Sequence, residues 1–198
     1  MSNHYYSERP VVKHNRQMHE ANLRGILLKF VTDAGVFSKT GVDFGSRLLI
    51  ESIELEKNAH VLDVGCGYGP IGLSAAKLAD EGHITMIDIN ERAVELAKEN
   101  ADLNRISNVT IVQSDIYEEV KGRSFDAIVT NPPIRAGKQV VHRIFSEGYE
   151  LLKPGGSMWI VIQKKQGAPS AKTKLEELFG EVREAAKSKG YSIFHAVK

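Results

Sequence analysis

The sequence predicts an α/β protein with a mostly parallel central sheet. From residue 59 onward, short apolar runs typical of buried strands alternate with stretches of helical periodicity. Strands that alternate with helices are joined by right-handed crossovers, which lay the helices over a parallel sheet. Glycines, prolines and acids follow the predicted strands, at the edge where such sheets bind ligands. The length of 198 residues suits one domain with a short extension.

The elements are predicted in a definite order along the chain. Residues 1–20 are polar and irregular. Ile26 to Val31 and Val36-Phe37 are predicted as short strands around a turn at 32–35, and Asp43 as the cap of a helix to about Ile53. The core then has strands at 59–64, 84–89, 109–112, 125–130 and 158–162, helices at 70–79, 90–104, 140–152 and 170–179, a turn at 153–156, and two strand-like pieces at 181–186 and 191–197.

These elements divide the chain into two parts. Residues 1–25 form a basic N-terminal tail, and residues 26–198 form the domain. Within the domain, residues 26–57 are a strand and helix extension, and residues 58–198 are the alternating core.

Composition indicates the cellular compartment of the protein. No apolar run approaches the roughly 20 residues that a membrane span needs, and the N-terminus lacks the apolar core of a secretory signal. Cys66 is the single cysteine, so no internal disulfide is possible. We expect a cytoplasmic protein without a membrane partner.

The charge pattern points weakly to nucleic acid. Net charge is only +1. The first 30 residues are basic, with Arg9, Lys13, Arg16, Arg24 and Lys29 against Glu8 and Glu20, and with His4, His14 and His19. A basic tail can follow phosphates, because neutralising them releases counterions. The alternative is a solvated, partly ordered terminus.

A glycine-rich loop follows the first core strand, in the segment Asp63-Val-Gly65-Cys-Gly67-Tyr-Gly69. Glycines at alternate positions allow backbone angles that other residues avoid, and they let a ligand approach the main chain. Dinucleotide enzymes use a similar loop, but with Gly-x-Gly-x-x-Gly spacing. Asp63 would also repel a pyrophosphate, whereas a donor that carries an ammonium group would tolerate it. The structural alternative is a tight strand-to-helix turn.

Two further acids follow the next two strands. Asp88 lies roughly 20 residues beyond the glycine loop, a spacing suited to accepting hydrogen bonds from ribose hydroxyls. The alternative, a helix-capping role, is open to Asn90 instead. Asp115 follows the third strand and could accept from an adenine amine, with a plain surface aspartate as a serious competitor.

The fourth core strand runs into Asn131-Pro132-Pro133-Ile134. Each proline fixes its own φ and pushes the residue before it toward an extended backbone, so the loop is stiff. The prolines lack N–H groups, so the segment offers acceptors, namely the Asn131 side-chain oxygen and the carbonyls. Two acceptors can hold a planar amine against an electrophilic methyl group and favour the charge that develops on nitrogen. The alternative is a turn that ends a strand.

Together these segments resemble class I methyltransferases that act on amino nitrogens. The N-terminal segments Thr32-Asp-Ala-Gly-Val-Phe-Ser38 and Val42-Asp-Phe-Gly-Ser46 narrow the resemblance to the catalytic domain of RsmC-type small-subunit ribosomal RNA guanine-N2 methyltransferases. The likeness runs from about residue 24 to the C-terminus. It implies a Rossmann-like methyltransferase domain over 26–198, with a seven-stranded mostly parallel sheet, an antiparallel last strand and helices on both faces.

The resemblance also implies a cofactor and a set of site residues. The cofactor is S-adenosyl-L-methionine, with S-adenosyl-L-homocysteine as product, and the partner is ribosomal RNA or the small ribosomal subunit. Asn131, Pro132 and Pro133 would orient the guanine amine. The donor would be bound by Phe37, Asp63, Gly65, Cys66, Gly67, Gly69, Asp88, Ile89, Asp115, Ile116 and Asn131. The target would contact Phe37, Ser38, Asp43, Ile134, Arg135 and Lys138, and no metal is expected.

The chain departs from this family in two respects. Ile134 stands where many members have an aromatic residue able to stack on the target base. The chain is also about half the length of the two-domain members. Substrate binding would then use the basic tail, the loop at 135–138, Lys164 and Lys165, or a partner.

Three alternative functions remain open at this level. Glutamine methyltransferases that act on protein also use an Asn-Pro-Pro loop. A nucleotide-binding module without catalysis and a dinucleotide oxidoreductase are the others. Cys66 is expected to be a packing residue and not a nucleophile, because nothing near it in sequence could activate a thiol. His142 falls on a predicted helix and is expected to be a structural residue.

Overall fold

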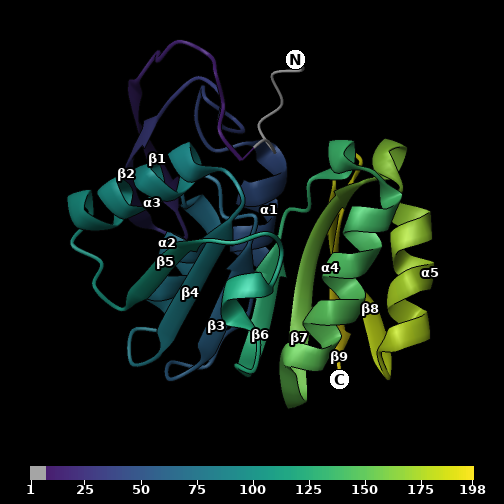
Figure 1. The fold of residues 1–198 in the computed structure, drawn as a ribbon. Helices are drawn as coiled ribbons and strands as arrows, with labels where there is room; N and C mark the ends of the chain where they lie inside the picture. Colours follow the sequence, from purple (N-terminus) through teal and green to yellow (C-terminus); the bar gives the residue numbers. More distant parts are fainter. Residues whose placement is uncertain (1–7) are drawn as a thin grey trace.

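The computed structural model describes residues 8–198 and contains a seven-stranded sheet flanked by helices, with a separate hairpin (Figure 1). The hairpin strands are β1 (Gln17–Leu23) and β2 (Ile26–Thr32). The sheet strands are β3 (His60–Val64), β4 (His83–Asp88), β5 (Val109–Gln113), β6 (Phe125–Thr130), β7 (Leu152–Gln163), β8 (Glu181–Ser188) and β9 (Tyr191–Val197). The helices are α1 (Phe44–Ser52), α2 (Pro70–Leu78), α3 (Glu91–Leu103), α4 (Lys138–Leu151) and α5 (Ala168–Leu178), with short 3-10 turns η1 (Glu118–Val120), η2 (Ile134–Ala136) and η3 (Lys164–Gln166).

The sheet has the order β5-β4-β3-β6-β7-β9-β8. The first five strands of this order are mutually parallel, and β9 pairs antiparallel with both β7 and β8. The mostly parallel sheet with an antiparallel last strand is therefore confirmed. Because β9 ends at the bottom of Figure 1, the carboxyl ends of the parallel strands lie at the top.

Alternating side chains divide the core into two layers. On β7, Met158 and Ile160 pack into the cluster that includes α4 and α5, whereas Trp159 and Val161 pack into the cluster that includes α1, α2 and α3. Figure 1 shows the same arrangement, with α4 and α5 together over one face. The period of two in the strands thus covers both faces of the sheet with helices, as predicted.

The N-terminal region differs from prediction in two places. Residues 17–20 are not irregular but belong to β1, which pairs with β2 through the turn Arg24-Gly25, where both residues have positive φ. Only Ala21 and Leu23 of β1 are buried, so the strand carries almost no apolar signal. Val36-Phe37 is a turn and not a strand, because Gly35 (φ +84°) and Ser38 (φ +56°) reverse the chain on either side.

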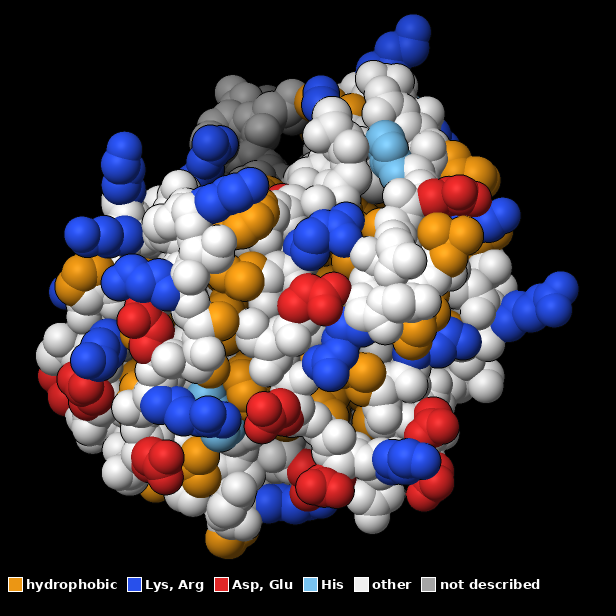
Figure 2. All heavy atoms as spheres, turned by 180° about the vertical axis from the view of Figure 1, so that it is seen from behind, with side chains coloured by type: hydrophobic (Ala, Val, Ile, Leu, Met, Phe, Trp, Pro, Cys, Tyr) orange, Lys and Arg blue, Asp and Glu red, His pale blue; other side chains and the backbone are white. Residues whose placement is uncertain are grey.

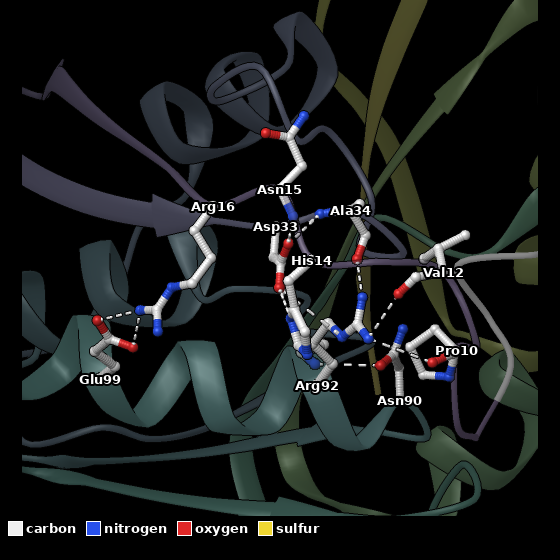
Figure 3. Close-up of polar contacts among 11 residues, drawn as sticks. Pro10, Val12, His14, Asn15, Arg16, Asp33, Ala34, Asn90, Arg92 and Glu99 are labelled. Carbon is white, nitrogen blue, oxygen red and sulfur yellow. Dashed lines mark hydrogen bonds and ion pairs between the residues drawn. The ribbon is translucent and has the colours of Figure 1, made fainter.

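Residues 8–16, here named the N-terminal strap, lie against α3 and the turn after β2 (Figure 3). Asp33 accepts hydrogen bonds from Asn15 N (2.6 Å) and Ala34 N (2.7 Å) and pairs with His14. Arg92 donates to the carbonyl oxygens of Val12 (3.1 Å), Pro10 and Ala34. Most of the predicted tail is thus attached to the body, while residues 1–7, with His4, lie outside the described residues. The domain boundary at residue 25 stays a prediction.

The remaining elements agree with prediction within a few residues, except at the start of β7. This strand begins at Leu152, and the predicted turn at 153–156 is an irregularity within it, between the pairs Phe125–Leu152 and Ala127–Ser157. Gly155 has φ +77°, which supplies the local bend. Among residues 8–198, no helix combines the length and the apolar character that crossing a membrane requires.

Candidate active site at the carboxyl edge of the sheet

The candidate site lies where the strand order reverses, between β3 and β6. In open α/β sheets this switch point opens a crevice beyond the carboxyl ends of the strands. Val64 and Thr130, the last residues of the two strands, are register partners, and the Thr130 hydroxyl donates to the Val64 carbonyl at 2.8 Å. The glycine loop and the Asn-Pro-Pro loop therefore start side by side.

The glycine loop has the backbone that the sequence predicts. Gly65 (φ +72°), Gly67 (+56°) and Gly69 (+102°) all lie in the left-handed region. The N–H groups of Gly65 and Cys66 both donate to the Ile87 carbonyl at 2.9 Å, which ties the loop to β4. A Cβ atom added to Gly65 or Gly67 would meet no atom within 4 Å. The loop thus borders open space that a ligand can fill, while its far side is packed.

Asp88 ends β4 directly beside the glycine loop. Its Oδ2 accepts from Gly67 N at 2.8 Å, and its Oδ1 accepts from Asn90 N at 2.9 Å. A carboxylate has about four lone-pair sites, so capacity for two ribose hydroxyls remains. Burial raises the pKa of Asp88 to about 6, and backbone N–H groups lower it less. Asn90 caps α3, with its side chain accepting from Ala93 N, so the predicted division of roles between the two residues is consistent with the geometry.

Asp63 is fully buried under the glycine loop. Neither carboxylate oxygen has a hydrogen-bond partner within range, although Gly72 N–H lies close enough to lower the pKa. Burial, with a smaller contribution from the charge of Asp88, raises the pKa of Asp63 to about 7. A Cβ on Gly72 would come within 2.8 Å of Asp63 Oδ2, so α2 passes close to the carboxyl group. Asp63 has no exposed surface, so it would affect a bound donor by supporting the glycine loop and by its electric field, not by direct contact.

The loop after β5 carries the predicted adenine contacts. Asp115 is exposed, and Ile116 has φ +49°, a backbone region that β-branched residues rarely adopt. The Ser114 hydroxyl donates to the Ile116 carbonyl at 3.0 Å, and Ser114 N donates to the Asp88 carbonyl at 2.9 Å. Strain of about 1–3 kcal/mol at one residue is typical of ligand sites. Asp115, Ile116, Asp88 and Ile89 thus stand on two linked loops, and their contacts to a donor stay predictions.

Asn131 follows β6 and is held by a residue to which the sequence analysis assigned no role. The Asn131 Nδ2 donates to the hydroxyl of Ser46, at 3.0 Å, in the first turn of α1. Ser46 is buried, and its own N–H donates to Asp43 Oδ1 at 3.0 Å. No described residue donates to Asn131 Oδ1. The loop therefore presents an amide oxygen of fixed orientation.

The two prolines complete the loop. Pro132 is buried, and its carbonyl accepts from Ile134 N at 2.8 Å, which uses one of two lone pairs. Pro133 N-caps η2, and its carbonyl accepts from Ala136 N at 2.9 Å. Ile134 is half-buried against the α4 and α5 cluster, whereas Arg135 and Lys138 are exposed beyond it.

The segment between β2 and α1 brings further predicted residues to this edge. Asp43 is the N-cap of α1, as predicted, and its field raises the pKa of Tyr68 in the glycine loop, after the larger effect of burial. Ser38 lies in the left-handed region and donates to the Gly41 carbonyl. Phe37 is 41% exposed. The structure thus places Asp43 and Ser38 beside Tyr68 of the glycine loop, and the contact of all three residues with a target base stays a prediction.

Cys66 is a core residue. It is buried in the cluster under α1, α2 and α3, and burial together with Asp88 and Asp63 raises the pKa of its thiol well above the ordinary value. A thiol in this setting is a poor nucleophile. The packing interpretation is confirmed. Within the described part of the chain, no group of three His, Cys, Asp or Glu side chains could hold a metal ion.

Comparison with known proteins agrees with this geometry. The chain is 59% identical over 200 residues to YbxB of Bacillus subtilis, covering all of both chains. It is 31% identical over 194 residues to the ribosomal RNA small subunit methyltransferase C of Escherichia coli, covering 96% of this chain and 54% of that protein. The chain therefore spans the full length of YbxB but only about half the length of the Escherichia coli protein.

A solved structure superposes on almost the whole chain. The 16S rRNA N2 G1207 methyltransferase RsmC of T. thermophilus, in complex with AdoMet and guanosine, matches with a TM-score of 0.83 and 27% identity, over 96% of this chain and 52% of that one. Fold and site together define a class I methyltransferase with a Rossmann-like sheet. Residues 27–195 match the model of the methyltransferase small domain, and the chain belongs to this family.

Proposed function

We propose that this protein methylates the exocyclic N2 amine of a guanine in small-subunit ribosomal RNA. The observation that carries the proposal is the Asn131 side chain, whose Nδ2 is held by buried Ser46 while Oδ1 has no donor among the described residues. An oxygen held in this way can accept a hydrogen bond from an amine and orient it. The partner is then ribosomal RNA or the small subunit, and the cytoplasm is the place of action.

The cofactor prediction is confirmed by the family match and by the neighbour solved with AdoMet. S-adenosyl-L-methionine supplies an electrophilic methyl group. The residues present fit it: the glycine loop borders open space at Gly65 and Gly67, and Asp88 has unused acceptor capacity beside that space. Buried Asp63, in its ionised form, places negative charge below the loop, which suits a cationic donor and opposes a pyrophosphate.

The chemistry asks for orientation more than for a base. An amine conjugated to a purine is a weak nucleophile, and its lone pair must point at the methyl group. Asn131 Oδ1 and the free lone pair of the Pro132 carbonyl can accept its two N–H groups and stabilise the positive charge that develops on nitrogen. The methylated nitrogen then releases one proton to water. Proximity and alignment supply most of the acceleration.

Support for an RNA substrate comes from the relatives and from charge. The Escherichia coli and T. thermophilus proteins are named as small-subunit ribosomal RNA methyltransferases, and the latter was solved with guanosine. Arg135 and Lys138 follow the Asn-Pro-Pro loop and are exposed, which suits a polyanion. Ile134 offers an aliphatic face to the base in place of an aromatic ring.

The test is transfer of labelled methyl from S-adenosyl-L-methionine to total RNA and total protein from cells that lack the gene. We expect label in small-subunit ribosomal RNA, recovered as N2-methylguanosine after digestion, and strongly reduced label with Asn131→Ala. Label in a protein band, as methylglutamine, would move the assignment to the protein branch. Donor binding without any label would leave a binding module.

A further inference from the structure

A shallow cavity between α4 and α5 begins next to the Asn-Pro-Pro loop, and of its lining residues only Lys138 has been given a role in substrate binding so far. It encloses about 250 Å³ and is lined by Lys138, His142, Ser170, Thr173, Lys174 and Glu177. In Figure 1, α4 lies in front of β7 and α5 lies beside α4 toward β8, with the first turns of both helices near the carboxyl edge of the sheet. We call this cavity and its six lining residues the α4–α5 groove.

The groove continues directly from the Asn-Pro-Pro loop. Pro133 N-caps η2, Gly137 N donates to the Ile134 carbonyl, and α4 then starts with Lys138. On the other side, η3 carries Lys164 and Lys165 immediately before α5. A strand whose base reaches Asn131 would therefore have its backbone close to this groove.

The charges around the groove are mostly unpaired. Arg135, Lys138, Lys164 and Lys165 form no ion pair with a described residue, whereas Lys174 pairs with Glu177 at 3.1 Å. Both Lys138 and Lys174 act on His142: after burial, they are the charges that lower its pKa. Two ammonium groups, an imidazole and the Ser170 hydroxyl on one concave surface are donors suited to phosphate oxygens. The Thr173 hydroxyl already donates to the Pro169 carbonyl at 3.2 Å, and Glu177 adds one carboxylate to the lining.

The N-terminal strap is a second basic surface, and two of its arginines are paired. In the N-terminal strap, Arg9 and Arg16 pair with Glu91 and Glu99 of α3, so part of the predicted basic tail is neutralised by the body. Figure 2 shows the face opposite to the groove, where Lys and Arg side chains dominate the upper part and acidic side chains lie among them mainly in the lower part. Unlike Arg9 and Arg16, the cations Arg135, Lys138, Lys164 and Lys165 have no ion-pair partner among the described residues that an anion would have to displace.

We propose that the α4–α5 groove holds a backbone phosphate of the RNA strand that carries the target guanine, with Lys138 and Lys174 as its charged contacts. This inference rests on the proposed function, because it names the binding surface of that substrate. In the free protein Lys174 forms an ion pair with Glu177, and a phosphate of the RNA would replace Glu177 as the partner of Lys174. The groove contributes to affinity and not to the chemical step.

The experiment compares double variants of equal charge change. Lys138→Gln/Lys174→Gln removes the two proposed contacts. The matched control is Lys121→Gln/Lys172→Gln, which removes lysines paired with Glu118 and Glu176 outside the groove. Binding of unmodified 16S ribosomal RNA is measured over a salt series, together with methyl transfer and the Kd of S-adenosyl-L-homocysteine.

We expect the groove variant to raise the RNA KM by on the order of tenfold and to lower the salt slope of RNA binding by about 1.4, at roughly 0.7 per contact with a single strand. The rate at saturating RNA and the Kd of S-adenosyl-L-homocysteine should stay the same, and the control should change little. Glu177→Gln, which frees Lys174, should tighten RNA binding by about two- to threefold.

Three results would overturn the inference. The groove and control variants could show the same salt slope, Glu177→Gln could weaken RNA binding, or the wild-type protein could fail to bind RNA. The first two, with normal methylation of 16S ribosomal RNA by the wild type, would leave the proposed function intact. A reduced slope in the groove variant without any RNA methylation by the wild type would instead overturn the proposed function.

Discussion

Replacement of Ser46 by alanine should slow methyl transfer although Ser46 is not placed to touch the reacting atoms. Its hydroxyl accepts from Asn131 Nδ2 at 3.0 Å, and it is buried in the first turn of α1. Loss of one such bond is worth about 1 kcal/mol, which corresponds to a rate reduced by a factor of about 5 to 10 if the bond is needed to orient Asn131 in the transition state. Asn131→Ala removes the acceptor itself and should cost about 100- to 1,000-fold.

The assay is single-turnover methyl transfer to unmodified 16S ribosomal RNA with saturating donor. Ser52→Ala is the matched control, because the Ser52 hydroxyl donates to the Leu48 carbonyl at 2.7 Å at the other end of α1. We expect Ser46→Ala to slow transfer with an unchanged Kd for S-adenosyl-L-homocysteine, and Ser52→Ala to react like the wild type.

A double-mutant cycle distinguishes positioning from a general loss of stability. If Ser46 acts only through Asn131, Ser46→Ala should cause no further loss in the Asn131→Ala background. A full rate in Ser46→Ala would refute the reasoning. So would an equal loss in both backgrounds, since Ser46 would then act by another route.

Three further predictions concern the donor site and the N-terminal strap. Asp88→Asn should weaken binding of S-adenosyl-L-homocysteine. The affinity of the wild type should fall as the pH drops through about 6, where Asp88 gains a proton, and the affinity of the variant should show no such step. Calorimetric titrations across pH 5–8 measure both. The pKa of Asp63 is about 7 in the folded protein and 3.8 ordinarily, so ionisation of Asp63 destabilises the fold progressively as the pH rises from about 4 to 7, by up to about 4 kcal/mol. Asp63→Asn should therefore raise Tm more at pH 8 than at pH 5. A Tm difference that does not depend on pH would contradict this prediction. Arg92→Met removes donors to three carbonyls and should lower stability by about 2 kcal/mol, measured by urea unfolding, whereas Arg16→Gln, which breaks an exposed pair, should cost under about 1 kcal/mol.

Much of the core could be predicted because its elements are periodic and its loops are punctuated. β6 and β9 have the predicted bounds, and the cap residues Asp43 and Asn90 begin helices as expected. These features depend on local chemistry, namely burial alternation, capping oxygens and prolines. The left-handed glycines of the glycine loop follow from the same kind of local rule.

The features that were missed depend on contacts between distant segments. β1 has two buried residues and is a strand because β2 pairs with it, which no periodicity in residues 17–23 reveals. Val36 is a buried apolar residue of a turn, so its hydrophobicity did not indicate the strand that was predicted there. Ser46 and Asn131 are 85 positions apart, and only the packing of α1 against the sheet brings them together. The donor and substrate roles of the predicted residues stay predictions until ligands are bound.

The position of β9 has a consequence for the order in which the protein can fold. β9 follows β8 in the chain but inserts between β7 and β8, and β8 pairs with no other strand. During synthesis, β8 therefore emerges before its template exists, and the edge of β7 with Trp159 and Ile160 stays open until β9 is made. The parallel strands can assemble as they leave the ribosome, but the part of the core beneath α5 cannot close until β9 has been made. A nascent chain paused before residue 191 would expose a hydrophobic strand edge that attracts chaperones or other chains.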